Sequence, residues 1–226
     1  SESGITTFQY EDGKEVNGYK CEHGGVARED HASFIDFSIT KNVATMLLAA
    51  FILISTNIFA QSEKYAPTMG ATLQQLGAAK TGEEMIAVAQ KFERIGDAEK
   101  TQWLPYYYAA MLKARMSMMG VGGDKDIVAD EATALVVKAE AIEKNNSEIL
   151  CIKSMIATAK MLVDPQARWM QYGAESNQFL EEAKKADAAN PRPYMLQSTS
   201  LKNTPEQYGG GCKTAKPLAE KAMEDV

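Results

Sequence analysis

Residues 103–110 of the chain read WLPYYYAA, and this stretch decides the fold because related octapeptides follow it at a fixed spacing. SEILCIKS occupies residues 147–154 and PRPYMLQS occupies residues 191–198, so each copy begins 44 residues after the previous one. The last column contains only the small residues Ala110, Ser154 and Ser198, which lets paired helices approach closely. The spacing therefore predicts a helix-turn-helix unit that repeats about every 44 residues.

On both sides of these octapeptides, apolar residues recur at three- and four-residue spacings, which predicts helices over residues 61–226. A leading helical pair is expected within Met69–Gly96, where Thr81 and Glu84 match a capping box. The other expected helices are Trp103–Met119, Asp124 or Asp126 to Lys144, Ser147–Val163, about Arg168 to Ala189, Pro191 to about Asn203, and Thr214 to the C-terminus. The fold class is therefore all-α.

The segment before this domain contains a short apolar run, VATMLLAAFILISTNIFA, from Val43 to Ala60. Lys41 precedes the run and a small residue ends it, which is typical of a secretory signal peptide at 41–60 with cleavage before Gln61. An uncleaved anchor or a buried core helix are the alternatives, although the run is short for a membrane span. Residues 1–40 stay unassigned and are not expected in the mature protein.

The composition limits the function. The chain of 226 residues is 45% hydrophobic and 24% charged, which excludes a mostly disordered or a polytopic membrane protein. A net charge of −6 argues against nucleic acid as a partner. Both histidines, His23 and His31, precede residue 61, so the helical domain cannot contain a Ser-His-Asp triad or a histidine-ligated metal.

A family resemblance follows from two stretches of the domain. Phe92-Glu93-Arg94-Ile95 with the octapeptide from Trp103, and Asn190-Pro191-Arg192-Pro193-Tyr194 with the TPEQYGGG run that starts at Thr204, resemble exported tetratricopeptide-repeat-like (TPR-like) proteins of Gram-negative bacteria. The resemblance implies a right-handed α-solenoid with a concave surface for a peptide or protein, and it implies no catalytic residues. The chain ends without a polar capping helix, from which we expect a truncated domain or a partner surface.

The resemblance also implies that the first helix of each unit lines the concave groove. The variable columns of this helix are expected to be exposed, and they align Ala109 with Lys153 and Gln197, and Met116 with Lys160 and Thr204. With Lys113 on the same helical stripe, these lysines predict a basic groove for a carboxylate-bearing peptide. Trp103 is a further candidate binding residue because it has no aromatic counterpart in the other units.

The alternative to a non-catalytic exported scaffold is a sugar-binding protein or hydrolase that uses carboxylates. Candidate acids are Glu93, Asp97, Glu175 and Glu181, but all lie among lysines on predicted solvated faces. We expect no cofactor and no metal, because the Cys21-Glu22-His23 segment and the acids around Asp124 lack the spacing of zinc or calcium sites. Cys151 is expected to be a buried thiol, with pairing to Cys212 as the alternative.

Overall fold

The computed structural model describes residues 8–9, 15–16 and 62–224. The chain divides into two compact units, residues 1–60 and residues 61–226. In the first unit, strands β1 (Phe8–Gln9) and β2 (Glu15–Val16) pair antiparallel, with Phe8 opposite Val16. The predicted signal peptide at 41–60 lies outside the described residues.

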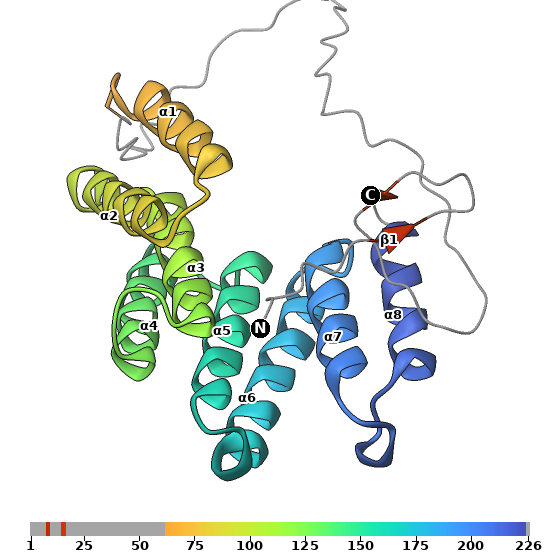
Figure 1. The fold of residues 1–226 in the computed structure, drawn as a ribbon. Helices are drawn as coiled ribbons and strands as arrows, with labels where there is room; N and C mark the ends of the chain where they lie inside the picture. The colour runs from red at the N-terminus through yellow and green to blue at the C-terminus, as the bar shows by residue number, and fades with distance from the viewer. Residues whose placement is uncertain (1–7, 10–14, 17–61, 225–226) are drawn as a thin grey trace, which may run out of the picture. The chain divides into compact units, whose positions relative to one another are not determined.

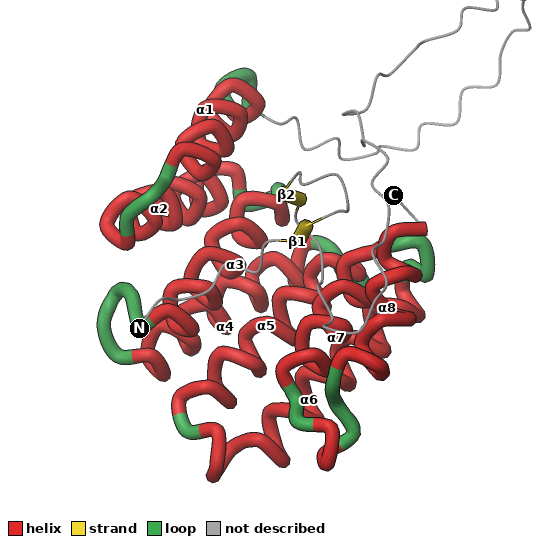
Figure 2. Tube along the Cα trace, turned by 45° about the vertical axis from the view of Figure 1, so that its right-hand side comes forward, coloured by secondary structure: helices red, strands yellow, loops and turns green. Residues whose placement is uncertain are grey.

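Residues 62–224 are helical, which confirms the all-α prediction for this unit. The helices follow one another in a row from α1 to α8, with neighbours packed side by side (Figures 1 and 2). Their bounds are α1 Tyr65–Ala78, α2 Gly82–Glu99, α3 Trp103–Met119, α4 Lys125–Ile142, α5 Ser147–Val163, α6 Pro165–Ala186, α7 Pro191–Asn203, the 3-10 turn η1 Glu206–Tyr208, and α8 Cys212–Glu224. No helix among these residues is long and apolar enough to cross a membrane.

Polar side chains begin most of these helices by accepting hydrogen bonds from the first free backbone amides. Thr81 and Glu84 form the predicted capping box at the start of α2. Asp124 caps α4 by accepting from the amides of Asp126 and Ile127, so this acid has a structural role. Asn146 and Asn190 cap α5 and α7 in the same way, and Asp164 caps α6.

The main apolar core extends from α1 to α5. Its fully buried members include Phe92, Leu112, Ala110 and Ile152, and Tyr106 and Tyr107 lie in the same cluster. A smaller cluster of Leu150, Cys151 and Ala183 links α5 to α6, with Phe179 and Leu196 packed against it. The prediction that the tyrosines of the first octapeptide serve as core residues is therefore confirmed for Tyr106 and Tyr107.

The small residues at the end of the three octapeptides are buried where helices pack against each other. Ala110, Ser154 and Ser198 are at most 2% exposed. The Ser154 hydroxyl lies 2.8 Å from the Ser176 hydroxyl of α6, and the Ser198 hydroxyl donates to the Ala215 carbonyl of α8 at 2.9 Å. Two members of this column thus contact the next helix along the chain, where a larger side chain would have no room.

A close backbone approach fixes the connection between α7 and α8. A Cβ atom at Gly210 would lie 2.1 Å from the Thr204 carbonyl oxygen, which no side chain can accommodate. The Gly210 amide donates to the Pro205 carbonyl and the Gly211 amide donates to the Leu201 carbonyl. The glycine run is therefore a tight connection between α7 and α8.

Candidate functional site

The three lysines of the predicted basic groove lie against α4, and each is paired with an acid of that helix. Lys153 lies 2.9 Å from Glu140 and Lys160 lies 2.8 Å from Asp130, while Lys113 pairs with Glu131. These lysine side chains are only 15–24% exposed. Their charge is locally compensated, so their immediate role is to hold α3 and α5 against α4.

The predicted exposed stripe on α3 is buried in part. Ala109 is 0% and Met116 is 1% exposed, because α3 packs against α2, α4 and α5 at the same time. Gln197 is also engaged, since its amide donates to Asn177 at 2.7 Å and to Glu181 at 2.9 Å. Trp103 is half-buried and lies edge-on to Tyr107, with ring centroids 5.6 Å apart. A ligand-binding role for Lys113, Lys153, Lys160, Gln197 and Trp103 stays a prediction.

A polar cluster that the sequence did not point to connects α3, α5 and α7. The Tyr107 hydroxyl donates to the Glu148 carboxylate at 2.6 Å, and the Arg192 guanidinium lies 2.7 Å from the same oxygen. Asn190 donates to the other Glu148 oxygen and to the Ser147 hydroxyl, each at 2.9 Å. The pattern of any one helix does not reveal this cluster, because it joins three segments that lie about 40 residues apart in the sequence.

The electrostatics of this cluster favour a structural role. Burial and the hydrogen bond to Glu148 raise the pKa of Tyr107 far above its ordinary value. Burial, followed by the nearby Glu148 carboxylate, raises the pKa of the Cys151 thiol to about 12. Both groups therefore stay protonated near neutral pH, whereas a general base works best with a pKa close to the working pH.

Two of the four candidate acids of the hydrolase alternative, Asp97 and Glu181, have hydrogen-bonding partners that include a lysine. Asp97 accepts hydrogen bonds from Lys138 at 2.8 Å and from Tyr106 at 2.9 Å, which lowers its pKa. Lys184 and Gln197 lower the pKa of Glu181 in the same way. A general acid needs a raised pKa, so these two carboxylates are poorly suited to protonating a leaving group.

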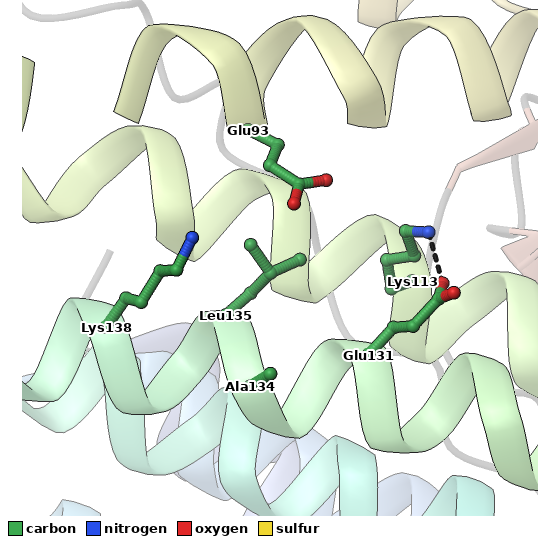
Figure 3. A pocket seen from close by; sticks show the side chains of 6 residues that line it. All are labelled: Glu93, Lys113, Glu131, Ala134, Leu135 and Lys138. Atoms are coloured by element: carbon green, nitrogen blue, oxygen red, sulfur yellow. Dashed lines mark hydrogen bonds and ion pairs between the residues drawn. The ribbon is translucent and has the colours of Figure 1, made fainter. Parts of the chain in front are cut away.

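A small pocket lies where α2, α3 and α4 meet (Figure 3). Its volume is about 190 Å³, and its charged lining residues are Glu93, Lys113, Glu131 and Lys138. Figure 3 shows Lys113 paired with the Glu131 carboxylate at one side of the pocket, while Ala134 and Leu135 form the apolar part of the lining. This volume is below the range of about 300–1,000 Å³ that is usual for small-molecule sites.

A larger cleft of about 410 Å³ lies between α1 and α2. Its interior is mostly apolar and includes the buried side chains of Tyr65 and Ile95. Lys64, Lys91 and Arg94 also line it, and no carboxylate in the described part of the chain lies within ion-pair distance of these three cations. This cleft is not recognisable in the sequence, because its two walls become neighbours only after the chain turns at residues 79–81.

One exposed aromatic pair lies outside both pockets. Trp169 on α6 and Tyr208 on η1 have ring centroids 6.3 Å apart and are 54% and 67% exposed. Met170 beside them is 70% exposed. Among the described residues, no group of three or more histidine, cysteine, aspartate or glutamate side chains could hold a metal ion. Cys151 is a free thiol, which excludes its pairing with Cys212.

The chain is thus a helical protein, and the apolar, cation-lined cleft between α1 and α2 has the geometry of a ligand-binding site. No protein-family model and no curated protein matches the chain. A solved structure does match, the HusA haemophore from Porphyromonas gingivalis, with 38% sequence identity and a TM-score of 0.66. The match covers 74% of this chain and 82% of that one. The chain therefore belongs to the same family as the HusA haemophore.

Proposed function

We propose that this chain is an exported, non-catalytic binding protein whose cargo is haem or a related porphyrin. The observation that carries the proposal is the 38% identity to a haemophore over 82% of that protein's length. An apolar cleft large enough for a small molecule supports it, as do carboxylates whose lowered pKa values do not suit acid catalysis.

The residue types in the helical unit restrict how the cargo could be held. Residues 61–226 contain no histidine, so no imidazole from these helices can bind the iron. The Cys151 thiol is buried and its pKa is raised to about 12, so it does not supply the thiolate that haem iron would need. Tyr65 lines the cleft between α1 and α2, and burial raises the pKa of its phenol, which disfavours a tyrosinate ligand to the iron. We therefore expect apolar contacts with the ring and ionic contacts with its carboxylates to supply most of the affinity.

A titration of the purified chain with haemin and with metal-free protoporphyrin tests the function. We expect both ligands to bind with dissociation constants within about tenfold of each other, because an iron–ligand bond contributes little. The readouts are the shift of the porphyrin absorption band and the quenching of tryptophan fluorescence. Failure of both ligands to bind would contradict the proposed function.

We also propose that the helices form a right-handed TPR-like solenoid with a period of about 44 residues. Two observations support this arrangement. Ala110, Ser154 and Ser198 are all buried. Asn146 and Asn190, which are also 44 residues apart, cap α5 and α7 through the same side-chain-to-amide hydrogen bond. An experimental structure would test the handedness and the repeat directly.

Export remains part of the proposal and depends on the apolar run before the helical unit. We propose that the segment 41–60 is a signal peptide and that the mature protein begins at Gln61. N-terminal sequencing of the protein recovered from the periplasm or the medium tests this. Recovery of an intact Met46–Ala60 segment in the membrane fraction would instead indicate an uncleaved anchor.

A further inference from the structure

The cleft between α1 and α2 has the chemistry of a site for an amphipathic anion. We propose that it is the porphyrin site, with Lys64, Lys91 and Arg94 binding the ligand's carboxylates and with Tyr65 and Ile95 contacting its ring. The inference rests on the proposed function and assigns that function a place in the fold. In Figure 1, α1 and α2 are neighbouring helices at the N-terminal end of the helical row.

Unpaired positive charge is the first argument. Seven cations elsewhere on the helices each lie within ion-pair distance of a carboxylate: Lys113, Lys138, Lys153, Lys160, Arg168, Lys184 and Arg192. By contrast, Lys64 and Arg94 are exposed, and Lys91 donates only to the neutral Gln75 amide, at 2.6 Å. Within the described part of the chain, these cations are therefore available to an external anion, which would also gain from partial shielding by the cleft walls.

The acid that lines the cleft does not compensate these cations. Glu99 accepts hydrogen bonds from the backbone amide and the hydroxyl of Ser62. Since α1 and α2 run antiparallel, Ser62 and Glu99 lie together at one end of the cleft, and Lys91 faces Gln75 toward the other end. Lys91 and Arg94 thus lie toward the end away from Glu99, where an anion is favoured, whereas Lys64, two residues from Ser62, lies at the Glu99 end.

The apolar lining is the second argument. Tyr65 and Ile95 are at most 9% exposed, and both belong to the main core cluster. These two side chains form the apolar part of the cleft, which Lys64, Lys91 and Arg94 also line. Thr68, Thr72 and Ala98 contribute to the lining as well. A volume of about 410 Å³ suits a ligand whose ring is enclosed in part and whose carboxylates remain at the rim.

The other surfaces carry less of this chemistry. The 190 Å³ pocket of Figure 3 is small, and its Lys113 is already paired with Glu131. The Trp169–Tyr208 pair offers exposed rings but lines neither the 190 Å³ pocket nor the cleft between α1 and α2. The surface around Trp169 and Tyr208 is therefore the alternative porphyrin site in the tests below.

The first test compares charge-reversed chains. Lys91→Glu/Arg94→Glu should weaken the binding of metal-free protoporphyrin about tenfold or more, because it replaces two cations by two anions at the rim. Lys144→Glu/Lys185→Glu makes the same change in net charge at two exposed lysines away from the cleft, one in the turn after α4 and one on α6, and it should alter binding by less than about twofold. Lys91→Gln/Arg94→Gln should give an intermediate loss, and circular dichroism checks that each chain is folded.

The second test removes the charge from the ligand. Protoporphyrin dimethyl ester keeps the ring but has no carboxylates, so its affinity should change by less than about twofold between the unmodified chain and Lys91→Glu/Arg94→Glu. Equal losses for the diacid and the ester would contradict carboxylate recognition by these residues. If the unmodified chain binds porphyrin and the charge-reversed chain binds it equally well, the site is wrong although the proposed function stands.

The two tryptophans provide an independent test of position. Trp103 packs against the same core cluster as Tyr65, while Trp169 lies on α6 beside Tyr208. Energy transfer to a bound porphyrin falls steeply with distance, so a chain with Trp169→Phe should retain strong quenching of Trp103. A chain with Trp103→Phe should show weaker quenching of Trp169. The opposite order would overturn the assignment and indicate the Trp169–Tyr208 surface.

Discussion

At the scale of single residues, Ser154 shows how little space separates α5 from α6. It is 2% exposed, and its hydroxyl lies 2.8 Å from that of Ser176. Ser154→Leu should destabilise the fold by roughly 1–3 kcal/mol, because it overpacks the contact and removes a buried hydrogen bond. Thermal unfolding measures the effect, and each kcal/mol corresponds to a loss of about 2–4 °C at this size.

Ser200→Leu is the matched control for this change, since Ser200 is exposed on α7. It should leave the melting temperature within about 1–2 °C of the original value, as surface substitutions usually do. Lys153 is not a neutral control, because its ammonium pairs with Glu140 and lies over the Phe179 ring. Equal effects at Ser154 and Ser200 would show that the small residue is not needed for helix contact.

Tyr107 supplies a second test at the residue scale. Its hydroxyl donates to the Glu148 carboxylate at 2.6 Å inside the cluster that joins α3, α5 and α7. Tyr107→Phe should cost about 1.5–3 kcal/mol of unfolding free energy, because hydrogen bonds to charged groups are stronger than neutral ones. In the control Tyr194→Phe, the lost bond is a long one of 3.4 Å at an exposed site, and we expect little change in chemical denaturation.

Residue burial was predictable where the repeat columns are apolar or small, and less so where they vary. The burial of Cys151 and of the small column follows from the sequence. Ala109 and Met116 were assigned to an exposed stripe because their columns contain lysine, yet both are buried. Packing of α3 against three other helices causes this difference, and a column comparison cannot reveal how many neighbours a helix has.

At the scale of elements, capping residues decide where the helices begin. Thr81→Ala removes the side-chain acceptor that binds the Glu84 amide, so it should cost about 1 kcal/mol of stability. Thr68→Ala is the control, because its exposed hydroxyl donates only to the carbonyl of Lys64, the residue before α1, and caps no amide. Chemical denaturation distinguishes the two, and a control loss as large as that of Thr81→Ala would contradict the capping argument.

Helix bounds were among the most predictable features. The helices at Trp103–Met119, Ser147–Val163 and Pro191–Asn203 occur where the sequence places them. The main difference is at α6, which begins at Pro165 rather than near Arg168. Asp164 caps this helix and Pro165 fits its first position, so α6 begins directly after α5 ends at Val163.

At the scale of the whole molecule, ion pairs between helices make stability depend on pH. Arg168 binds both carboxylate oxygens of Asp126 at 2.6 and 2.9 Å, which lowers the pKa of that carboxyl below its ordinary value. A lowered pKa in the folded state contributes stability above the unfolded-state value of about 3.9, and this contribution disappears as the pH falls through the folded value. Asp97 and Glu181 act in the same direction.

Asp126→Asn should therefore lower the melting temperature at pH 7 and have progressively less effect below about pH 4. Melting curves of the original and substituted chains across this range provide the measurement. A difference that stayed constant down to pH 2 would show that the charge of Asp126 is not what stabilises the contact between α4 and α6.

The candidate site was the least predictable feature at this scale. Lys64 and Lys91 belong to no motif, and the Phe92–Ile95 stretch that contains Arg94 indicates a family but no site. The three cations face one cleft only because α1 folds back on α2. The lysines that do follow the repeat are instead paired with α4. Charge patterns within one helix reveal its polar face, whereas the pairing of that face depends on helix contacts that a single sequence does not show.

The buried thiol between α5 and its neighbours has a practical consequence for kinetics. Cys151 is 0% exposed and its pKa is about 12, so a disulfide reagent can modify it only when this part of the fold opens. The rate of modification, followed by peptide mapping at neutral pH, therefore reports how often α5 separates from α6 and α7. Saturation with porphyrin should slow this reaction if cargo binding suppresses that opening. The native Cys151 thus reports the opening of the α5 region, and no further cysteine has to be introduced.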